Sequence, residues 1–272
     1  MRIYTKAGDL AFKTFTFHDG QPHFKLETYE LDFHEVTVEM TLANPTDLLM
    51  MVLVASTLRQ HGYQQVNLDI RYLLGARMDR AISSQEPFTL QSIAGIINSC
   101  GFSKVRILDV HSEVATRLIR NSTNILPYAT VQHAITATQA VRLVIPDKGA
   151  VPRVEALQRR VKGYYSTIRC SKVRDVATGN LTGFTVDNCP SHDIEEVIIL
   201  DDICDGGGTF VGLAEELRKR SATKVYLFVT HGIFSKGLPL KGVDKVYTTD
   251  SRFVQTTATQ DIVVIPISMK DM

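Results

Sequence analysis

Short apolar runs alternate along this chain with longer segments in which apolar residues recur at helical spacing. The runs predict buried strands, and they cover residues 66–73, 104–108, 141–145, 197–200 and 224–229. The longer segments predict helices over residues 48–60, 86–100, 151–161 and from 210 onward. Strands and helices that alternate in this way are typical of a mainly parallel sheet, so we expect an α/β protein.

The two ends of the chain carry further strand signals, because apolar and polar residues alternate there. These strands are expected at residues 1–4, 10–17, 34–42, 243–250 and 261–267. Asp47 is the expected N-cap of the helix over 48–60. That helix is apolar nearly all round, so we expect it to be buried.

Two segments interrupt this pattern. Residues 169–180 are polar, show no apolar period and end in Gly179 and Asn180, which predicts a mobile loop. The pattern is weakest over residues 125–140. We therefore expect two domains, residues 1–130 and residues 131–272, each with its own sheet.

Composition narrows the class of protein. The 272 residues are 44% hydrophobic and 22% charged, as in a globular protein with an ample core. A net charge of +1 gives no bias toward nucleic acid or a membrane surface, and the apolar run at 48–55 is too short to span a bilayer. The N-terminus lacks the apolar core of a targeting signal, and four cysteines lack metal-ligand spacing. We therefore expect a cytoplasmic protein with reduced thiols.

The most informative stretch is VIILDDICDGGGTF, residues 197–210. A strand leads into Asp201 and Asp202, and Asp205 precedes a glycine triplet, Thr209 and the start of a helix. Glycines let backbone N–H groups approach a ligand, and a helix N-terminus favours negative charge, so together they suit a phosphate. Paired carboxylates suit the hydroxyls of a sugar diol. The alternative is a tight turn that only happens to be rich in glycine.

Other predicted strands also end in residues that can do chemistry. They are Asp109 and His111, Asp147, the Asp201–Asp202 pair, and His231. An aspartate at a strand end often only caps the next turn. Because ligands of open parallel sheets bind beyond the carboxyl ends of the strands, several such ends together indicate a site.

These segments resemble one enzyme family in order. The stretch 197–210 resembles the PRPP loop of type I phosphoribosyltransferases and of ribose-phosphate diphosphokinases, the PRPP synthetases. Residues 71–114 are similar to the diphosphokinase segment with an A-R-x-D-R turn and a strand that ends in D-x-H. Further similar segments are VIPDKGAVPR at 144–153, SKVRD at 171–175, THGIFSKG at 230–237 and FHDG at 17–20. The chain is identified as a short, divergent member of the PRPP synthetase family.

The resemblance implies a fold, a reaction and partners. The fold is two phosphoribosyltransferase type I-like, Rossmann-like α/β domains with mainly parallel sheets, the first on the ATP side and the second on the ribose phosphate side. The reaction is Mg²⁺-dependent transfer of the β,γ-diphosphoryl group of ATP to the anomeric hydroxyl of ribose 5-phosphate. The implied partners are these small molecules and further copies of the chain in a homo-oligomer, without nucleic acid or membrane.

The resemblance also implies the role of individual residues. Lys172, Arg174 and His111 are the implied catalytic residues, and His111 and Asp147 the implied metal site. The implied ATP-binding residues are Asp19, Arg77, Asp79 and His111. The implied ribose phosphate-binding residues are Asp201, Asp202, Asp205, Gly206, Gly207, Gly208 and Thr209.

The chain departs from the family pattern at several of these segments. Met78 stands where the family usually has Gln, Gln21 where it has Glu, and Gly206 where it has Thr. Three alternatives stay open. One is the same transfer to a larger 5-substituted ribose such as ADP-ribose, for which Gly206 would give room. The others are a catalytically silent regulatory subunit and a phosphoribosyltransferase that consumes PRPP, against which the catalytic residues and the extended first half argue.

Overall fold

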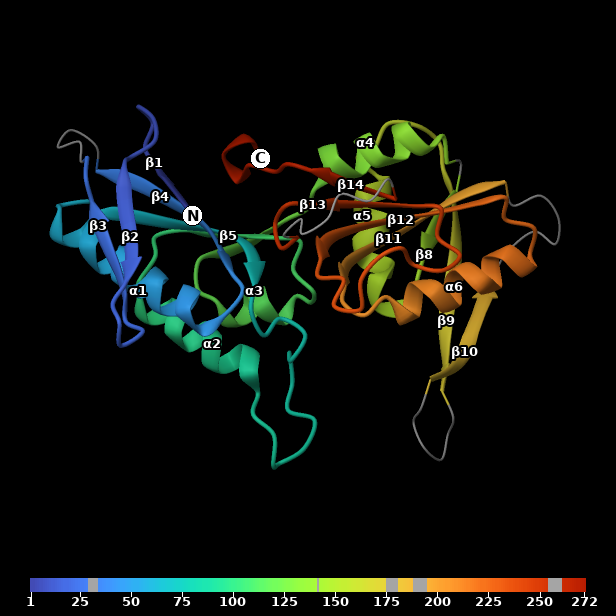
Figure 1. Ribbon diagram of the computed structural model, residues 1–272, viewed down its shortest axis with the longest axis horizontal. Helices are drawn as coiled ribbons and strands as arrows, with labels where there is room; N and C mark the ends of the chain where they lie inside the picture. The colour runs from blue at the N-terminus through green and yellow to red at the C-terminus, as the bar shows by residue number, and fades with distance from the viewer. Residues whose placement is uncertain (29–33, 141, 175–180, 188–194, 254–260) are drawn as a thin grey trace. The chain divides into compact units, whose positions relative to one another are not determined.

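The structure is a computed structural model that describes residues 1–28, 34–140, 142–174, 181–187, 195–253 and 261–272 (Figure 1). Its contacts divide the chain into two compact units. The first is Met1–Ile125 together with Ser268–Met272, and the second is Leu126–Ile267. The last five residues, which the sequence placed with the second half, therefore pack with the first unit.

The first unit is built on a five-stranded sheet, with a separate two-stranded ribbon of β2 (Phe12–Thr16) and β3 (Pro22–Leu26). In the order of the sheet, the strands are β1 (Arg2–Tyr4), β4 (Glu35–Leu42), β5 (Gln65–Leu73), β6 (Val105–Leu108) and β7 (Ser122–Ile125). Only β1 runs antiparallel to its neighbour in this sheet. The helices are α1 (Pro45–Gln60), α2 (Thr89–Ser99) and α3 (Val114–Leu118).

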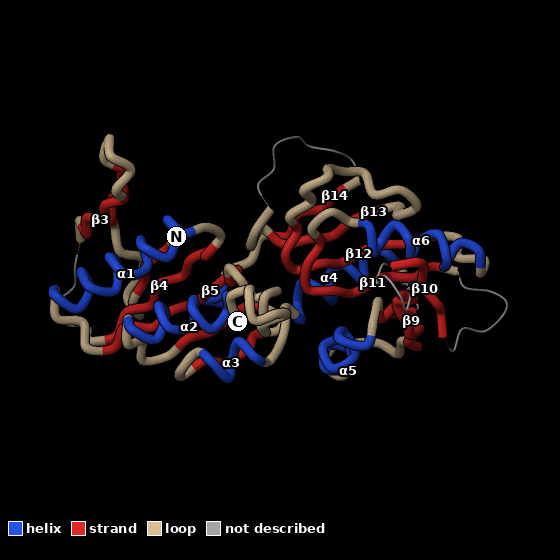
Figure 2. Tube along the Cα trace, turned by 90° about the horizontal axis from the view of Figure 1, so that it is seen from below, coloured by secondary structure: helices blue, strands red, loops and turns tan. Residues whose placement is uncertain are grey.

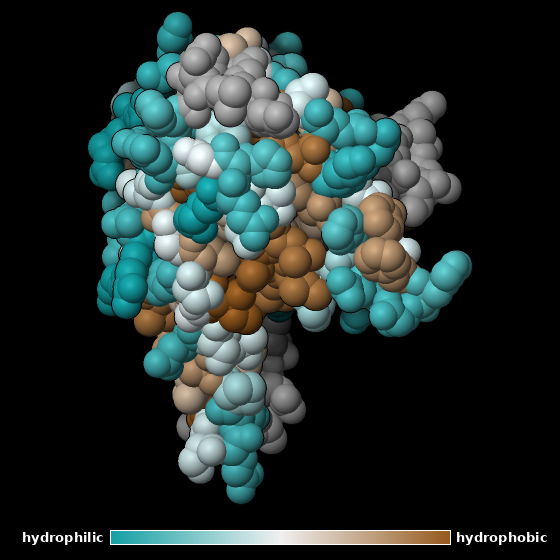
Figure 3. Space-filling model, turned by 90° about the vertical axis from the view of Figure 1, so that its left-hand side faces the viewer, coloured by the Kyte–Doolittle hydropathy of each residue, from teal (hydrophilic) through white to brown (hydrophobic). Residues whose placement is uncertain are grey.

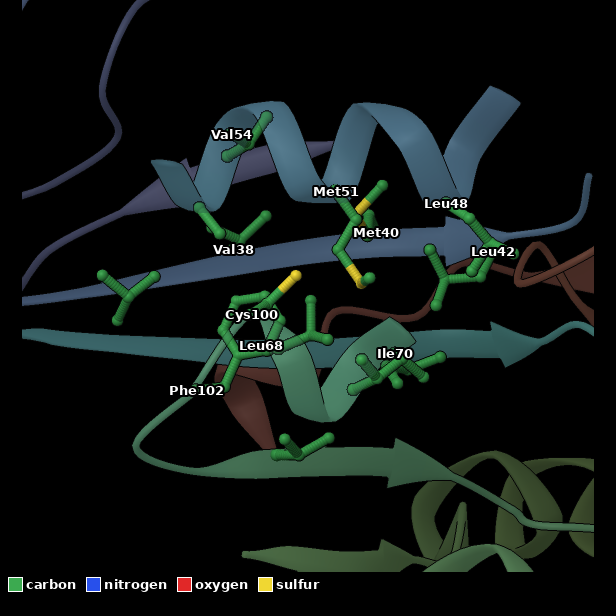
Figure 4. Close-up of a cluster of buried hydrophobic side chains, with 14 of the residues drawn as sticks. Val38, Met40, Leu42, Leu48, Met51, Val54, Leu68, Ile70, Cys100 and Phe102 are labelled. Atoms are coloured by element: carbon green, nitrogen blue, oxygen red, sulfur yellow. The ribbon is translucent and has the colours of Figure 1, made fainter. Parts of the chain in front are cut away.

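Helix α1 shows how the core of this unit forms. Figure 4 shows Leu48 beside Leu42 of β4 and Met51 beside Met40, so apolar residues of one helix face meet the sheet. The opposite face is not buried, since Leu49 is 45% exposed, and the expectation of a helix buried all round was wrong. The N-cap is Asn44 rather than Asp47. Asp47 is the third helical residue, and the two side chains form a reciprocal capping box.

The second unit is built on a seven-stranded sheet (Figure 2). In order, the strands are β10 (Leu181–Asp187), β9 (Ser166–Arg174), β8 (Arg142–Ile145), β11 (Glu196–Cys204), β12 (Lys224–Gly232), β13 (Lys245–Thr249) and β14 (Ile262–Ile265). Only the β9–β10 pair is antiparallel. The helices are α4 (Tyr128–Thr138), α5 (Val151–Gln158) and α6 (Gly208–Lys219).

Strand β11 is apolar without interruption because both of its faces are covered. Val197 and Ile199 pack in the cluster that contains residues of α6, whereas Ile198 and Leu200 pack in the cluster that contains residues of α4 and α5. The mainly parallel α/β architecture predicted from the sequence is therefore confirmed in both units.

Several boundaries differ from the prediction. Residues 169–174, expected in a mobile loop, continue β9 and pair with β10, because Ile168, Cys170 and Val186 give this ribbon a buried face. Residues 175–180 lie outside the described part of the chain. Strand β11 runs past Leu200, pairing with β12 as far as Cys204. Helix α2 begins at Thr89 rather than Glu86, and α3, β7 and α4 were not predicted. Of the described helices, none is long and apolar enough to cross a membrane.

Candidate functional site

Strand β11 places two carboxylates at its carboxyl end, between β8 and β12. Asp202 is buried and Asp201 is partly buried, and Asp201 Oδ1 accepts a 3.0 Å hydrogen bond from the Asp202 backbone N–H. Burial and the Asp202 carboxylate raise the pKa of Asp201 well above its ordinary value, and the Arg153 guanidinium opposes this. The pair is thus an acidic centre that a ligand with several hydroxyl donors can satisfy.

Arg153 is a member of this centre that the sequence analysis did not single out. It lies on α5, six residues after Asp147, and its Nη2 donates to Thr230 Oγ1 of β12 over 3.2 Å. Its charge acts on Asp201 from the same place. The signal was present, since Arg153 closes the segment VIPDKGAVPR, but no spacing rule links that residue to a strand end 77 residues later.

A buried hydroxyl network joins the ends of β12 and β13. His231 Nδ1 lies 2.8 Å from Ser251 Oγ, and Ser251 Oγ donates to the Thr230 carbonyl over 3.0 Å. Thr249 Oγ1 also donates to the Thr230 carbonyl, over 2.7 Å. The imidazole of His231, which stood out in the sequence at a strand end, therefore helps to hold the ends of β12 and β13 together through Ser251.

The glycine turn that follows β11 leads directly into α6. Gly207 has φ +75° and is the N-cap, and its carbonyl accepts from the Phe210 and Val211 N–H groups at 3.0 Å each. This left-handed conformation requires glycine. Gly208 opens the helix, and a Cβ added there would meet no atom within 4 Å. Open space therefore lies beside the helix N-terminus, where the sequence predicted a phosphate.

The other two glycines of the triplet make room for the loop after β12. A Cβ on Gly206 would lie 3.3 Å from Lys236 Cδ and Cε, and one on Gly207 would lie 2.5 Å from Leu240 Cδ2. The loop is also tied to the turn by polar contacts, since Ser235 Oγ donates to Asp205 Oδ1 over 2.6 Å. The space that the sequence assigned to a larger substrate at Gly206 is thus filled by the Lys236 stem.

Cys204 lies at the end of β11, between the acidic pair and the turn, and is fully buried. Burial, with the charges of Asp201 and Asp205, raises the pKa of this thiol to about 12. Because the thiolate is the nucleophilic form, Cys204 is unsuited to covalent catalysis. Cys100 and Cys204 are free thiols.

In the first unit, the loops after β5 and β6 form a pocket of about 290 Å³, lined by Arg77, Met78, Asp79, Arg80, Ile82 and His111. It unites three of the predicted ATP-binding residues: Arg77, Asp79 and His111. Arg80 and Ile82 were not predicted to bind a ligand, whereas Met78 stood out in the sequence as a departure from the family pattern. Asp19 is not among the lining residues; it closes the turn between β2 and β3, where its Oδ1 accepts from the Gln21 N–H over 3.0 Å.

The remaining predicted residues are placed as follows. Asp147 follows β8, and its Oδ1 accepts from the Gly149 and Ala150 N–H groups at 2.9 and 3.2 Å, so it caps the short helix at residues 148–150. The backbones of Lys172 and Arg174 lie in β9, opposite residues of β10. Their side chains lie outside the described part, so their catalytic roles stay predictions.

The Asp147 carboxylate suits a Mg²⁺ ion that phosphate oxygens also bind. Among the described residues, no group of three or more His, Cys, Asp and Glu side chains could hold a metal by itself. Mg²⁺ at phosphate sites is usually held by one or two carboxylates, with phosphate oxygens and waters completing its shell. Asp147 supplies a carboxylate of this kind at a strand end, whereas the His111 nitrogen is a poorer match for so hard a cation.

Comparison with known proteins finds similar enzymes along most of the chain. Residues 130–262 match the phosphoribosyl transferase domain family. Ribose-phosphate pyrophosphokinase of Pyrococcus furiosus is 26% identical over 86% of this chain and 84% of its own length. The enzymes of that name from Thermococcus kodakarensis and Haemophilus influenzae are 28% and 26% identical, over 86% and 92% of this chain and 80% and 81% of their own lengths.

The fold agrees with this relationship. The crystal structure of phosphoribosylpyrophosphate synthetase from Mycobacterium smegmatis superposes with a TM-score of 0.78, covering 94% of this chain and 86% of that one, at 18% identity. Because the match covers 94% of this chain, it includes residues of both α/β units. The matched domain, the ribose-phosphate pyrophosphokinase relatives and the agreement in fold together support the ribose-phosphate pyrophosphokinase, or PRPP synthetase, family for this chain.

Proposed function

We propose that this protein is a ribose-phosphate diphosphokinase that transfers the β,γ-diphosphoryl group of ATP to the anomeric hydroxyl of ribose 5-phosphate, giving PRPP and AMP. The observation that carries the proposal is the acidic strand end Asp201–Asp202, which leads through the glycine turn into the N-terminus of α6. That arrangement provides acceptors for a sugar diol and donors for a phosphate along one short stretch of chain.

On the ribose phosphate side, the carboxylates of Asp201 and Asp202 accept hydrogen bonds from the 2- and 3-hydroxyls of the ribose. The backbone N–H groups of residues 205–209 and the Thr209 hydroxyl bind the 5-phosphate at the start of α6. Arg153 balances the charge of the acidic pair. Holding the sugar at both points fixes the direction in which its anomeric hydroxyl approaches, and such alignment is a large part of phosphoryl-transfer catalysis.

On the nucleotide side, Arg77, Asp79 and His111 bind ATP in the pocket of the first unit. Asp19 is the fourth ATP-binding residue that the family resemblance implies, although it does not line this pocket. Lys172 and Arg174 neutralise the charge that develops on the β-phosphoryl group. Asp147 would hold Mg²⁺, which would neutralise charge on the triphosphate, and the family resemblance also implies His111 as a metal ligand. We infer further that the enzyme acts in the cytoplasm as a homo-oligomer, a dimer or higher.

A second candidate is the same transfer to a larger 5-substituted ribose, such as ADP-ribose. The open space beside Gly208 favours it, because a Cβ added there would meet no atom within 4 Å. One experiment separates the candidates. The protein is incubated with ATP, Mg²⁺ and either acceptor, and AMP and the diphosphorylated product are measured by mass spectrometry. AMP formed with neither acceptor would instead support a catalytically silent subunit.

A further inference from the structure

The loop after β12 holds a lysine against the glycine turn. Lys236 is exposed, yet its stem lies so close to Gly206 that an added Cβ would be 3.3 Å from its Cδ and Cε. Gly206 is not among the residues with positive φ, so its backbone does not require glycine. The absence of a side chain at 206 therefore serves the packing of Lys236 rather than the conformation of the turn.

The same loop is anchored to the turn immediately before this lysine. The Ser235 N–H donates to the Asp205 carbonyl over 3.1 Å, and Ser235 Oγ donates to the Asp205 carboxylate over 2.6 Å. The turn carbonyl of Phe234 accepts from the Gly237 N–H over 2.8 Å. The lysine backbone is thus fixed on both sides, and the reach of its ammonium is limited to the surroundings of the turn.

Lys236, like Lys148, Lys162 and Lys245, has no carboxylate partner among the described residues of this unit. Lys219, Lys224 and Lys241 each pair with a carboxylate. Lys236 makes no ion pair or hydrogen bond with the described residues, although three carboxylates, Asp201, Asp202 and Asp205, precede the turn. A phosphate monoester carries about −1.5 to −2 charges, and a helix N-terminus offers only about +0.5. An acidic turn therefore needs a further cation to hold a phosphate.

We propose that Lys236 is a phosphate-binding residue of the acceptor site, and that Gly206 is the space in which its stem packs. The inference rests on the proposed function, because that function places the 5-phosphate at this turn. The ammonium contacts the phosphate from the side of the β12 loop, opposite the N–H groups of α6. Thr209, the N–H groups and Lys236 then surround the same group.

The test uses Lys236→Met, which keeps an apolar stem of similar length and removes the charge. Loss of one charged hydrogen-bond partner should raise the KM for ribose 5-phosphate, and the Kd for inorganic phosphate by calorimetry, by about 10- to 100-fold. The KM for ATP and kcat should stay within about threefold, because the lysine does not touch the transferred group. Lys236→Arg should restore most of the affinity.

Lys219→Met is the matched control, since it removes an ion-paired lysine from the other end of α6. Acceptor KM and phosphate Kd that are equal in Lys236→Met and this control would overturn the proposal. Gly206→Ala provides a second test, because its Cβ displaces the lysine stem without removing a charge, and it should weaken phosphate binding at unchanged melting temperature. If the wild-type protein formed no PRPP, the proposed function would fail, while phosphate titration would still decide the role of Lys236.

Discussion

Asp201 shows at the scale of one residue how a binding site opposes the stability of its own fold. Its pKa is raised in the folded protein, chiefly by burial and then by Asp202. The folded state therefore binds a proton more tightly than the unfolded state. The resulting stability is fully present below the ordinary value of 3.8 and is lost as the pH rises through the folded pKa. Near neutral pH, the raised pKa of Asp201 therefore makes the fold less stable.

We therefore expect Asp201→Asn to raise the melting temperature near neutral pH. The rise should be about 2–4 °C for each kcal/mol by which the substitution increases the free energy of unfolding. The gain should shrink as the pH falls below the ordinary carboxyl range, where Asp201 is protonated in the wild type as well. The KM for the acceptor should rise, because an amide is a weaker acceptor for the ribose hydroxyls. A melting temperature lowered near neutral pH, or a gain independent of pH, would contradict the assignment.

The glycine triplet predicts opposite outcomes for neighbouring substitutions. Gly207→Ala places a Cβ at φ +75° and 2.5 Å from Leu240 Cδ2, so it should cost about 2–4 kcal/mol in the free energy of unfolding. Gly208→Ala meets no atom within 4 Å and lies in a helix, so it should be neutral or stabilising by about 0.5–1 kcal/mol. Gly208→Ala should nevertheless raise the acceptor KM, because it fills space beside the helix N-terminus. Denaturant unfolding and kinetics on both variants test this.

Single residues also show where sequence reasoning reached its limit. The carboxylate pair, the glycine turn and Thr209 were recognisable because their chemistry is local in the chain. The cause of the glycines at 206 and 207 was not, because Lys236 and Leu240 lie about thirty residues away in sequence. The cap of α1 was misassigned for a different reason. Asn44 and Asp47 are both good N-caps, and only the observed hydrogen bonds separate the cap from its reciprocal partner.

At the scale of elements, β9 and β10 are where sequence and structure differ most. The alternation of Ile168 and Cys170 with polar residues was too short to outweigh the charges that follow it. The segment forms a strand because it pairs antiparallel with β10, where Lys172 lies opposite Phe184. The predicted catalytic residues thus stand on a ribbon rather than in a structureless loop. Because β9 is a defined strand, the backbone positions of Lys172 and Arg174 are fixed by their pairing with β10.

Removing Lys172 should therefore separate activity from stability. Lys172→Ala should lower kcat by about 10²–10³-fold, as expected for the loss of one group that stabilises charge in the transition state. The melting temperature should hardly change, because Lys172 belongs to a polar segment without an apolar period, and substitutions outside a core usually cost less than about 0.5 kcal/mol. Arg169→Ala on the same strand is the control, since it removes an exposed cation paired with Glu155. Near-normal turnover of Lys172→Ala would remove this ribbon from the mechanism.

At the scale of the whole molecule, the first unit is discontinuous in sequence, because residues 268–272 pack with its sheet. Arg106 Nη2 of β6 donates to the Met269 carbonyl over 2.6 Å and to Asp69 Oδ2 over 2.5 Å. The Tyr4 hydroxyl donates to the same carboxylate over 2.8 Å, so β1, β5 and β6 share one buried network. The sequence could not reveal this return, because nothing in residues 265–272 marks a change of partner.

Deletion of residues 268–272 should therefore destabilise the first unit selectively. The deletion removes the buried Met269 side chain, whose loss should cost about 2–5 kcal/mol, and leaves Arg106 without its carbonyl acceptor. It also removes the backbone hydrogen bond that lowers the pKa of Glu39 against the effect of burial.

Hydrogen exchange should accelerate in β1, β4, β5 and β6, while β8, β11 and β12 keep their protection. Lys270→Ala, which loses a 5.1 Å cation–π contact with Tyr4 and a charge interaction with Asp9, is the matched control and should cost less than about 1 kcal/mol. Equal loss of protection in both units would show instead that the C-terminal residues stabilise the molecule as one cooperative body.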